Sequence, residues 1–138
     1  VESAQAFTDY RDLLAMEELD GVVVATPDHW HALMTLDALA AGKHVYLETP
    51  ACRTLAEGRA LVHTAETQGR MIQVGNLGRA NAAVAAVARA VRAGRVGKVN
   101  SFQCWSNPAP AAEPEEPSDS PPELDWDRWL GPAFERPY

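Results

Sequence analysis

The chain has 138 residues, 46% of them hydrophobic, which is the length and apolar content of one globular domain. Its formal net charge of −7 argues against a nucleic-acid-binding surface, because phosphate binding requires an excess of lysine and arginine. No apolar run approaches the ~20 residues that a membrane-spanning helix needs, so we expect no membrane partner. The two cysteines lack metal-ligand spacing, and we expect Cys52 and Cys104 to be unpaired thiols.

The first elements predicted are a short helix and a strand. Residues 9–18 suit a helix whose apolar side chains share one face, namely Tyr10, Leu13 and Leu14. Gly21 ends it before residues 22–25, which are apolar without alternation. Such a run is typical of a parallel strand that is covered by helices on both faces.

A second helix is predicted after this strand. Asp28 is a suitable N-cap residue and Gly42 fits the helix end. We expect its buried stripe to consist of Leu33, Leu36 and Ala40. His29 and His31 would point about 200° apart on a helix, so we expect no metal site. His31 then has two alternatives: a hydrogen bond at the floor of a ligand crevice, or bracing of the turn.

The same pattern then repeats along the chain. A strand is predicted at 44–47, a capping box of Thr54 and Glu57 opens a helix that ends at Gly69, and another strand follows at 71–74. We expect this helix to bury Leu55, Leu61, Val62 and Ala65. Asn81 is expected to cap a third helix, which carries Val84, Val87 and Val91. The period of roughly 25 residues between strands is that of βαβ units and predicts an α/β fold with a parallel sheet.

The last 41 positions, residues 98–138, have a different character. A further strand is predicted at 98–106, and the prolines and acids of 107–124 predict an extended, exposed loop. Residues 124–132 suit a short helical turn with Trp126 and Trp129, which we expect to serve mainly as packing groups. Residues 79–98 form a basic stretch that contains Arg79, Arg89, Arg92, Arg95 and Lys98. We interpret it as a solvated helix face; the alternative is a surface for a partner.

The candidate site lies where the first two strands end. Thr26-Pro27 and Glu48-Thr49-Pro50 would lie side by side at the edge where open α/β sheets bind ligands. A carboxylate such as Glu48 can accept hydrogen bonds from both hydroxyls of a ribose; the alternative is a surface or ion-paired glutamate. Asn76 and Arg79 either orient a polar ligand or belong to an ordinary turn. The chain contains no G-x-G-x-x-G phosphate-binding pattern.

Four ordered segments carry a resemblance to a known family. They are Ala-Thr-Pro-Asp-His-Trp-His at 25–31, Ala-Gly-Lys-His-Val-Tyr-Leu-Glu-x-Pro at 41–50, Ile-Gln-Val-Gly-Asn at 72–76 and Leu-Asp-Trp-Asp-Arg-Trp-Leu-Gly-Pro at 124–132. Together they resemble the glucose-fructose oxidoreductase / inositol dehydrogenase (Gfo/Idh/MocA) family. The resemblance implies an oxidoreductase that uses NAD or NADP, acts on a sugar, cyclitol or related polyol, and forms homo-oligomers.

The resemblance also implies a domain organisation. Residues 1–97 would be the later part of a Rossmann dinucleotide-binding domain without its first βαβ unit. Residues 98–138 would be the start of a second α/β domain. A sheet without its first strands exposes an apolar edge, so we expect the isolated chain to be only marginally stable. The compartment is expected to be the cytoplasm, or the periplasm if an export signal precedes Val1, as in some family members.

Carried over by position, the resemblance implies roles for individual residues. Thr26, Pro27 and His31 would line the cofactor crevice, and Glu48 would hold the ribose on the nicotinamide side. Asn76 would lie close to the nicotinamide or the substrate. The segment that folds back toward the cofactor would contribute Arg128 and Trp129.

One position departs from the family pattern in a way that affects chemistry. Thr49 stands where the family has the lysine of Glu-Lys-Pro, which bonds to the reacting hydroxyl and supplies positive charge. A threonine donates a hydrogen bond but brings no charge, so proton transfer should be impaired. We expect no turnover by these residues alone. The alternative is a non-catalytic relative that binds a nucleotide or sugar or serves in assembly.

Overall fold

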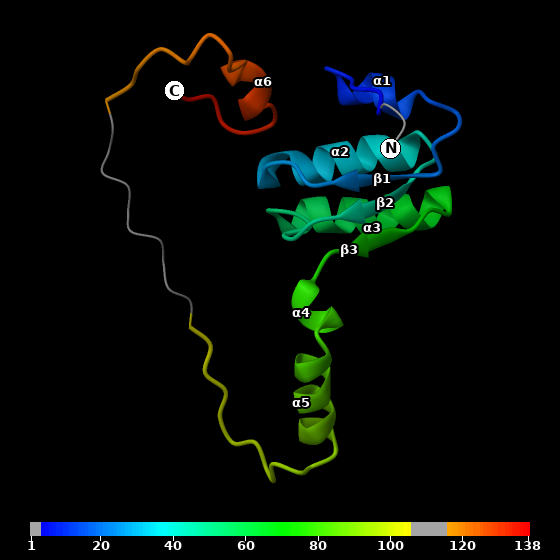
Figure 1. Cartoon of the computed structure of the whole chain (residues 1–138), viewed down its shortest axis with the longest axis vertical. Helices are drawn as coiled ribbons and strands as arrows, with labels where there is room; N and C mark the ends of the chain where they lie inside the picture. The colour runs from blue at the N-terminus through cyan, green and yellow to red at the C-terminus, as the bar shows by residue number, and fades with distance from the viewer. Residues whose placement is uncertain (1–3, 106–115) are drawn as a thin grey trace. The chain divides into compact units, whose positions relative to one another are not determined.

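The computed structural model describes residues 4–105 and 116–138 (Figure 1). They fall into two units, which we treat separately: the described residues of 1–75 together with 127–135, and those of 76–126 together with 136–138. The helices are α1 (Tyr10–Leu14), α2 (Asp28–Ala40), α3 (Leu55–Gln68), α4 (Leu77–Ala80), α5 (Ala82–Arg92) and α6 (Trp126–Leu130). The strands are β1 (Gly21–Val24), β2 (His44–Leu47) and β3 (Ile72–Val74).

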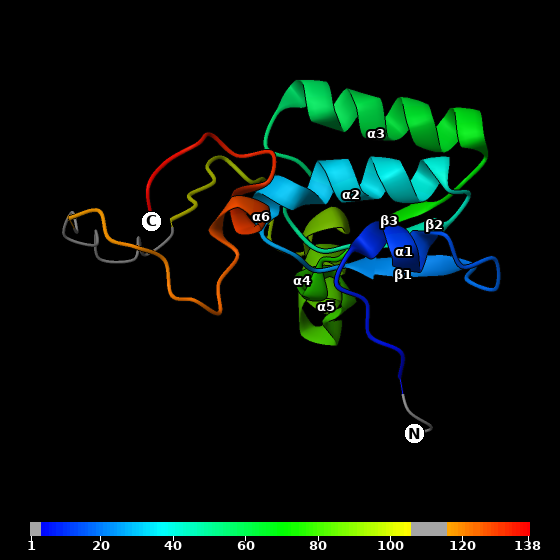
Figure 2. The same ribbon diagram turned by 90° about the horizontal axis from the view of Figure 1, so that it is seen from above.

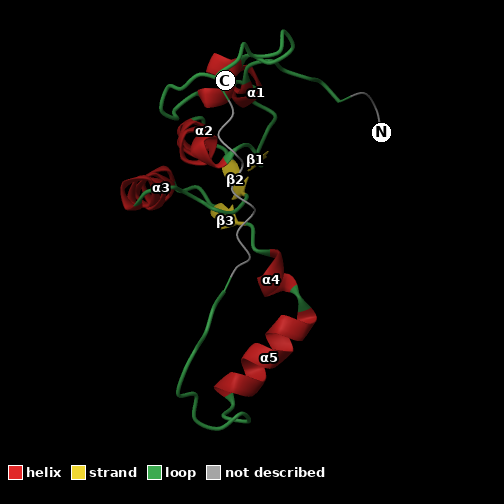
Figure 3. Ribbon diagram, turned by 90° about the vertical axis from the view of Figure 1, so that its left-hand side faces the viewer, coloured by secondary structure: helices red, strands yellow, loops and turns green. Residues whose placement is uncertain are grey.

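The first unit is built on a parallel sheet with strand order β1-β2-β3. The predicted α/β class and the three predicted strands are therefore confirmed. Figures 2 and 3 show α2 and α3 on the same side of the strands, where α2 packs on β1 and β2 and α3 packs beside α2. Short apolar strands joined by helical crossovers explain the parallel pairing, because a two-residue turn cannot connect parallel strands.

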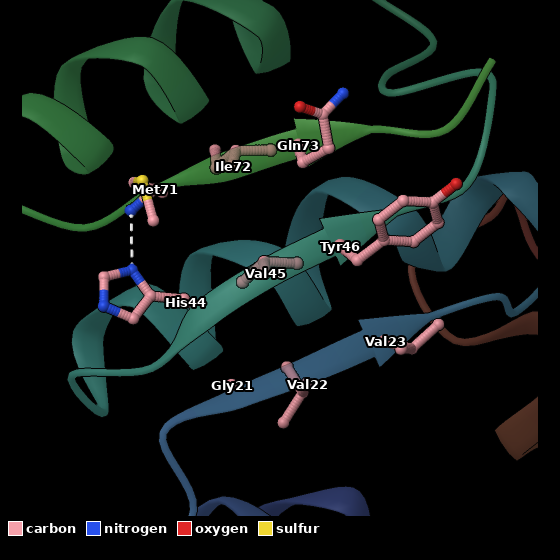
Figure 4. A pocket seen from close by; sticks show the side chains of 9 residues that line it. All are labelled: Gly21, Val22, Val23, His44, Val45, Tyr46, Met71, Ile72 and Gln73. Carbon is pink, nitrogen blue, oxygen red and sulfur yellow. Dashed lines mark hydrogen bonds between the residues drawn. The ribbon is translucent and has the colours of Figure 1, made fainter. Parts of the chain in front are cut away.

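The opposite face of the sheet is uncovered by the described residues of this unit, contrary to the expectation of helices on both faces. Figure 4 shows this open face, on which Val23, Tyr46 and Gln73 are register neighbours. Val23 is 70% exposed, although its neighbour along the strand, Val24, is 5% exposed. Alternate residues of each strand therefore lie on the helix-covered face and on the open face.

The core lies between the sheet and the two helices. Its buried members are Leu14, Val24, Ala38, Leu39, Val45, Leu47 and Leu61. The predicted stripe of α2 is only partly right: Leu36 is half-buried and packs against the core, but Leu33 is also only half-buried and Ala40 is exposed. The buried residues of this helix are His31, Ala32, Thr35, Ala38 and Leu39. Small side chains form much of the true stripe, because they allow the helix to approach the strands closely.

The predicted inner face of α3 is partly wrong as well. Leu61 is buried and Ala65 packs against the core, but Leu55 is 84% exposed and Val62 is 59% exposed. This helix contacts mainly α2, so only a narrow part of its surface is covered.

Local capping chemistry explains where the helices begin and end. The Thr54–Glu57 capping box is present, and Gly69 ends α3 with φ +61, a left-handed conformation that favours glycine. Asn81 accepts hydrogen bonds from the first amides of α5, as predicted. Asp28 is not the cap of α2: Pro27 holds that position, and Asp28 is the first helical residue, where its negative charge favours the helix N-terminus.

The second unit contains α4, α5 and extended segments. The strand predicted at 98–106 is wrong for residues 98–105, which have no regular structure, and Ser106 lies outside the described residues. A strand requires a partner for its backbone groups, whereas Phe102 and Trp105 are 87% and 81% exposed. Of the loop predicted at 107–124, residues 116–124 contain no helix or strand, and the rest lies outside the described residues.

The described ranges 4–105 and 116–138 contain neither a helix able to span a membrane nor a side-chain cluster suited to a metal ion. No helix there has the length and apolar content needed to cross a bilayer. No cluster of three or more His, Cys, Asp or Glu side chains in these ranges is arranged to hold a metal ion. Cys52 and Cys104 are both free.

Candidate functional site

The ends of β1 and β2 lie next to each other at one edge of the sheet. Val24 pairs with Leu47, and the Glu48 amide donates a hydrogen bond to the Val24 carbonyl at 2.9 Å. Thr26 lies two positions after the end of β1, and Glu48 lies one position after the end of β2. The two residues therefore project from the same edge of the sheet. This is the adjacency that the two sequence motifs predict, at the carboxyl ends of parallel strands where ligands bind.

A pocket of about 190 Å³ opens beside Thr26 and Pro27 within the first unit. Its walls come from α1, the end of β1, the first turns of α2, and α6. The predicted residues that line it are Thr26, Pro27, Arg128 and Trp129. Six further residues, which the sequence did not assign to the site, line it as well: Thr8, Asp9, Tyr10, Arg11, Trp30 and Met34.

The α6 wall is attached to the first turn of α2. Trp30 Nε1 donates a hydrogen bond to the Trp129 carbonyl at 3.1 Å, and His29 Nε2 lies 2.6 Å from the same oxygen. The rings of His29 and Trp129 meet edge to face with centroids 5.0 Å apart. The tryptophan-containing turn thus packs on residues about one hundred positions earlier.

Gly131 explains how the chain passes this wall. Its φ is +45, and a Cβ added there would lie 2.0 Å from Cζ2 of the Trp30 indole. Only glycine leaves room for the indole at this point, because any larger residue would overlap the ring. The glycine in the Leu-Gly-Pro sequence therefore permits close packing of the segment on Trp30.

The Thr26 hydroxyl is an unusual feature of the pocket wall. Its oxygen is buried and has no hydrogen-bond partner among the residues that the structure describes. Leaving such a group unpaired costs about 1–3 kcal/mol. The Thr35 hydroxyl of α2 is buried and unpaired among the described residues in the same way, but only Thr26 lines this pocket. The hydroxyl, the aromatic walls and the Arg128 side chain fit a ligand with a flat ring and polar substituents. A dinucleotide would need to extend further along the sheet edge, past Glu48.

His31 lies beneath this edge and is 1% exposed. Its Nε2 is 2.8 Å from the Thr26 carbonyl, and its Nδ1 is 2.7 Å from the Pro50 carbonyl. Both ring nitrogens therefore face main-chain oxygens that follow two different strands. The sequence left two roles open for His31: a hydrogen bond to a ligand, or bracing of the turn. This geometry corresponds to bracing, because the imidazole holds the backbone on which the site is built.

Glu48 and Thr49 lie beyond the end of β2. Glu48 is half-buried, and its carboxylate accepts only a long hydrogen bond, 3.4 Å, from the Thr49 amide. Within the described part of the chain, no cation pairs with it. Glu48 therefore does not form an ion pair with any of the described residues. Thr49, at the position of the family lysine, is exposed.

Lys43 is buried in the first unit, whereas Asn76 and Arg79 belong to the second. Lys43 is 6% exposed and its Nζ donates to the Met16 carbonyl at 2.6 Å, so its amine is used within the fold. Asn76 belongs to the second unit, where it precedes α4 and makes no side-chain capping bond. Arg79 lies in the last turn of α4.

Tyr10, at the pocket wall, donates a hydrogen bond to the Asp37 carboxylate. Burial first, then this bond and the negative charge of Asp37, raise the pKa of Tyr10 to about 12. The phenol therefore stays protonated at neutral pH. No sequence motif marks Tyr10; its position on the apolar face of α1 was the one available signal.

A parallel sheet with a pocket at its carboxyl edge is the arrangement in which open α/β domains bind ligands, and comparison with known proteins specifies the family. Residues 1–76 match the Gfo/Idh/MocA model, described as an oxidoreductase family with an NAD-binding Rossmann fold. This match covers more than half of the chain, and the chain belongs to that family. The family resemblance, the fold and the NAD-type cofactor expected from the sequence are thereby confirmed.

Curated relatives cover only part of the chain. A glycosyl hydrolase family 109 protein of Shewanella sp. (strain W3-18-1) is 39% identical over 69 residues, which is 49% of this chain and 15% of the relative. A glycosyl hydrolase family 109 protein 1 of Shewanella sp. (strain ANA-3) is 41% identical over the same length. The chain thus spans 15% of the length of these relatives.

Solved structures show the same fold. The WlbA dehydrogenase from Bordetella pertussis, in complex with NADH and UDP-GlcNAcA, is 30% identical with a TM-score of 0.65, over 69% of this chain and 28% of its own. The myo-inositol 2-dehydrogenase from Lactobacillus plantarum is 24% identical with a TM-score of 0.62, over 67% of this chain and 28% of its own. At that lower identity the likeness concerns the fold.

Proposed function

We propose that this chain is part of an NAD(P)-dependent oxidoreductase that acts on a sugar, cyclitol or related polyol. One observation carries the proposal: the end of β1, with its unpaired buried threonine hydroxyl, and the end of β2, with an unneutralised carboxylate, lie side by side at one sheet edge. A hydroxyl and a carboxylate at that edge suit a nucleotide, whose ribose offers two hydroxyls.

Each predicted site residue has a role in this proposal. Thr26 and Pro27 contact the cofactor in the pocket, with Arg128 and Trp129 on its far wall. Glu48 accepts hydrogen bonds from a ribose, and Asn76 lies toward the nicotinamide or substrate. His31 contributes through the two carbonyls that it braces. When bound, a nicotinamide supplies hydride transfer, and the chain's own residues position the two reactants.

The names of the relatives support a polyhydroxylated substrate. The similar proteins include a myo-inositol 2-dehydrogenase and a dehydrogenase crystallised with UDP-GlcNAcA and NADH. The curated relatives are named as glycosyl hydrolases. All of these names involve a sugar or a cyclitol, and we propose the same class of substrate for the protein to which this chain belongs, with a homo-oligomeric assembly.

Cofactor binding is tested by calorimetric titration of the 138-residue chain with NADH and with NADPH. We expect binding of at least one, and a loss of roughly tenfold in Thr26→Val, which removes the hydroxyl at constant shape. Thr8→Val, in the same pocket but not marked by an unpaired buried hydroxyl, is the control. Absence of binding to both dinucleotides contradicts the proposal.

A second candidate function is favoured by Thr49. A relative without the family lysine would bind a nucleotide or sugar without catalysis. Thr49→Lys in the complete protein distinguishes the two, since the exposed position can accept a lysine. A large gain in dehydrogenase activity supports an otherwise intact catalytic site. No gain, together with retained cofactor binding, supports the non-catalytic role.

A further inference from the structure

Tyr46 and Glu48 occupy the same face of the sheet at the carboxyl end of β2. They are two residues apart, and successive residues of a strand alternate between faces. Figure 4 shows the Tyr46 side chain on the open face, with its hydroxyl directed toward the carboxyl end of the strand. A tyrosine hydroxyl is thereby brought toward the candidate edge; Tyr46 lies within the 41–50 motif, but the resemblance implies no role for its side chain.

The two polar groups converge above Gly75, which follows β3. A Cβ built on Gly75 would lie 2.8 Å from Glu48 Oε2 and 2.9 Å from the Tyr46 hydroxyl oxygen. Both oxygens therefore approach the same point, and the missing side chain of Gly75 is what leaves that point free. Gly75 itself is joined to β2 by a hydrogen bond from its amide to the Leu47 carbonyl at 2.7 Å.

Both oxygens have hydrogen-bonding capacity left over. Within residues 4–105 and 116–138, the Tyr46 hydroxyl makes no hydrogen bond, and Glu48 has only the 3.4 Å contact with the Thr49 amide. A carboxylate accepts up to four hydrogen bonds, and a phenol donates one and accepts others. The pair thus offers acceptors and one donor within reach of a single ligand group.

We propose that Tyr46 is a further binding residue, which together with Glu48 holds a vicinal diol above Gly75. The carboxylate accepts the diol hydroxyls while the phenol donates to one of their oxygens. This inference rests on the proposed function, in which Glu48 binds a ribose, and it adds two determinants: the Tyr46 hydroxyl and the absence of a side chain at Gly75. The diol comes either from the nicotinamide-side ribose or from a polyol substrate.

Two substitutions test the pair without damaging the core. Tyr46→Phe removes one oxygen from a side chain that is 38% exposed. Gly75→Ala introduces the Cβ that meets the ends of two flexible side chains, so the oxygens are displaced while the backbone is kept. Tyr138→Phe, a phenol in the second unit, is the matched control. Circular dichroism establishes that each variant is folded like the wild type.

The readout is calorimetric titration of the full 138-residue chain with three probes: NADH, ADP and myo-inositol. We expect Tyr46→Phe to weaken binding roughly three- to tenfold, as the loss of one hydrogen bond predicts, and Gly75→Ala to weaken it at least as much. If the pair binds the nicotinamide-side ribose, the variants lose affinity for NADH while their affinity for ADP, which lacks that ribose, is unchanged. If a free polyol is held, myo-inositol affinity falls instead.

The negative outcomes separate the two proposals. If wild type binds NADH or myo-inositol and both variants bind them equally well, the role of Tyr46 is overturned while the proposed function stands. If wild type binds none of the three probes, the proposed function fails and the diol site fails with it. In the double variant Tyr46→Phe/Gly75→Ala, losses that do not add support a shared site, because neighbouring determinants are coupled.

Discussion

The Tyr10 hydroxyl donates a hydrogen bond to the Asp37 carboxylate and so joins α1 to α2 across 27 positions of the sequence. Burial and this partner raise the pKa of Tyr10 from 10.0 to about 12. The protonated phenol is therefore favoured by folding. Its contribution to stability is complete below pH 10 and is lost as the pH rises through about 12.

We expect an alkaline loss of stability between pH 10 and 12 that is reduced in Tyr10→Phe. The measurement is the free energy of unfolding at several pH values, together with the phenolate absorbance of wild type minus that of Tyr10→Phe. The difference absorbance should rise near pH 12 in the folded protein. A midpoint at pH 10 contradicts the assigned hydrogen bond.

Gly131→Ala should displace α6 from Trp30. The new methyl group would lie 2.0 Å from the indole, and overpacking of this kind costs about 1–3 kcal/mol. Urea unfolding and quenching of tryptophan fluorescence measure the effect, with a more accessible indole expected. Gly69→Ala is the control for backbone strain, because its φ is +61 and no atom lies within 4 Å of the added Cβ. Equal losses in the two variants would show that the overlap with Trp30 is unimportant.

His31→Leu should lower the free energy of unfolding by about 1–3 kcal/mol, because the imidazole contacts with the Thr26 and Pro50 carbonyls are lost and leucine cannot hydrogen-bond to either oxygen. His63→Leu, at an exposed position on α3, should be nearly neutral. Urea denaturation of the two variants provides the comparison. Wild-type stability in His31→Leu would contradict the bracing role.

Thr54→Ala should cost about 1 kcal/mol through loss of the α3 N-cap. Its hydroxyl accepts from the Glu57 amide at 3.2 Å, and Ala offers no replacement acceptor. Thr54→Ser retains the hydroxyl and should remain close to wild type. Thermal unfolding followed by circular dichroism distinguishes them; identical transitions for the two variants would refute a capping contribution.

Much of the fold follows from local patterns. Apolar runs that follow the helix-ending glycines Gly21, Gly42 and Gly69 located β1, β2 and β3, and the Thr54–Glu57 box located the start of α3. The stripe of α2 could not be read from hydrophobicity, because a histidine and a threonine are buried there alongside small residues. The strand expected at 98–106 failed for residues 98–105 because an extended segment becomes a strand only when a partner supplies its hydrogen bonds.

The site could be predicted in part. The motifs identified Thr26, Pro27, Arg128 and Trp129, which line one pocket. The attachment of α6 to α2 depends on tertiary contacts across about one hundred residues, and no local pattern encodes it. Tyr46 could have been found by the two-residue period of a strand, since it precedes Glu48 by two positions.

The attachment of Trp129 to His29 and Trp30 has a consequence for proteolysis. One wall of the pocket beside Thr26 stays in place through a covalent tether that holds it at high effective concentration. A single backbone cut between residues 76 and 126 would turn this wall into a separate peptide whose association depends on its own concentration. Such a cut, at residues that do not line the pocket, would thus weaken ligand binding while every lining side chain stays chemically intact.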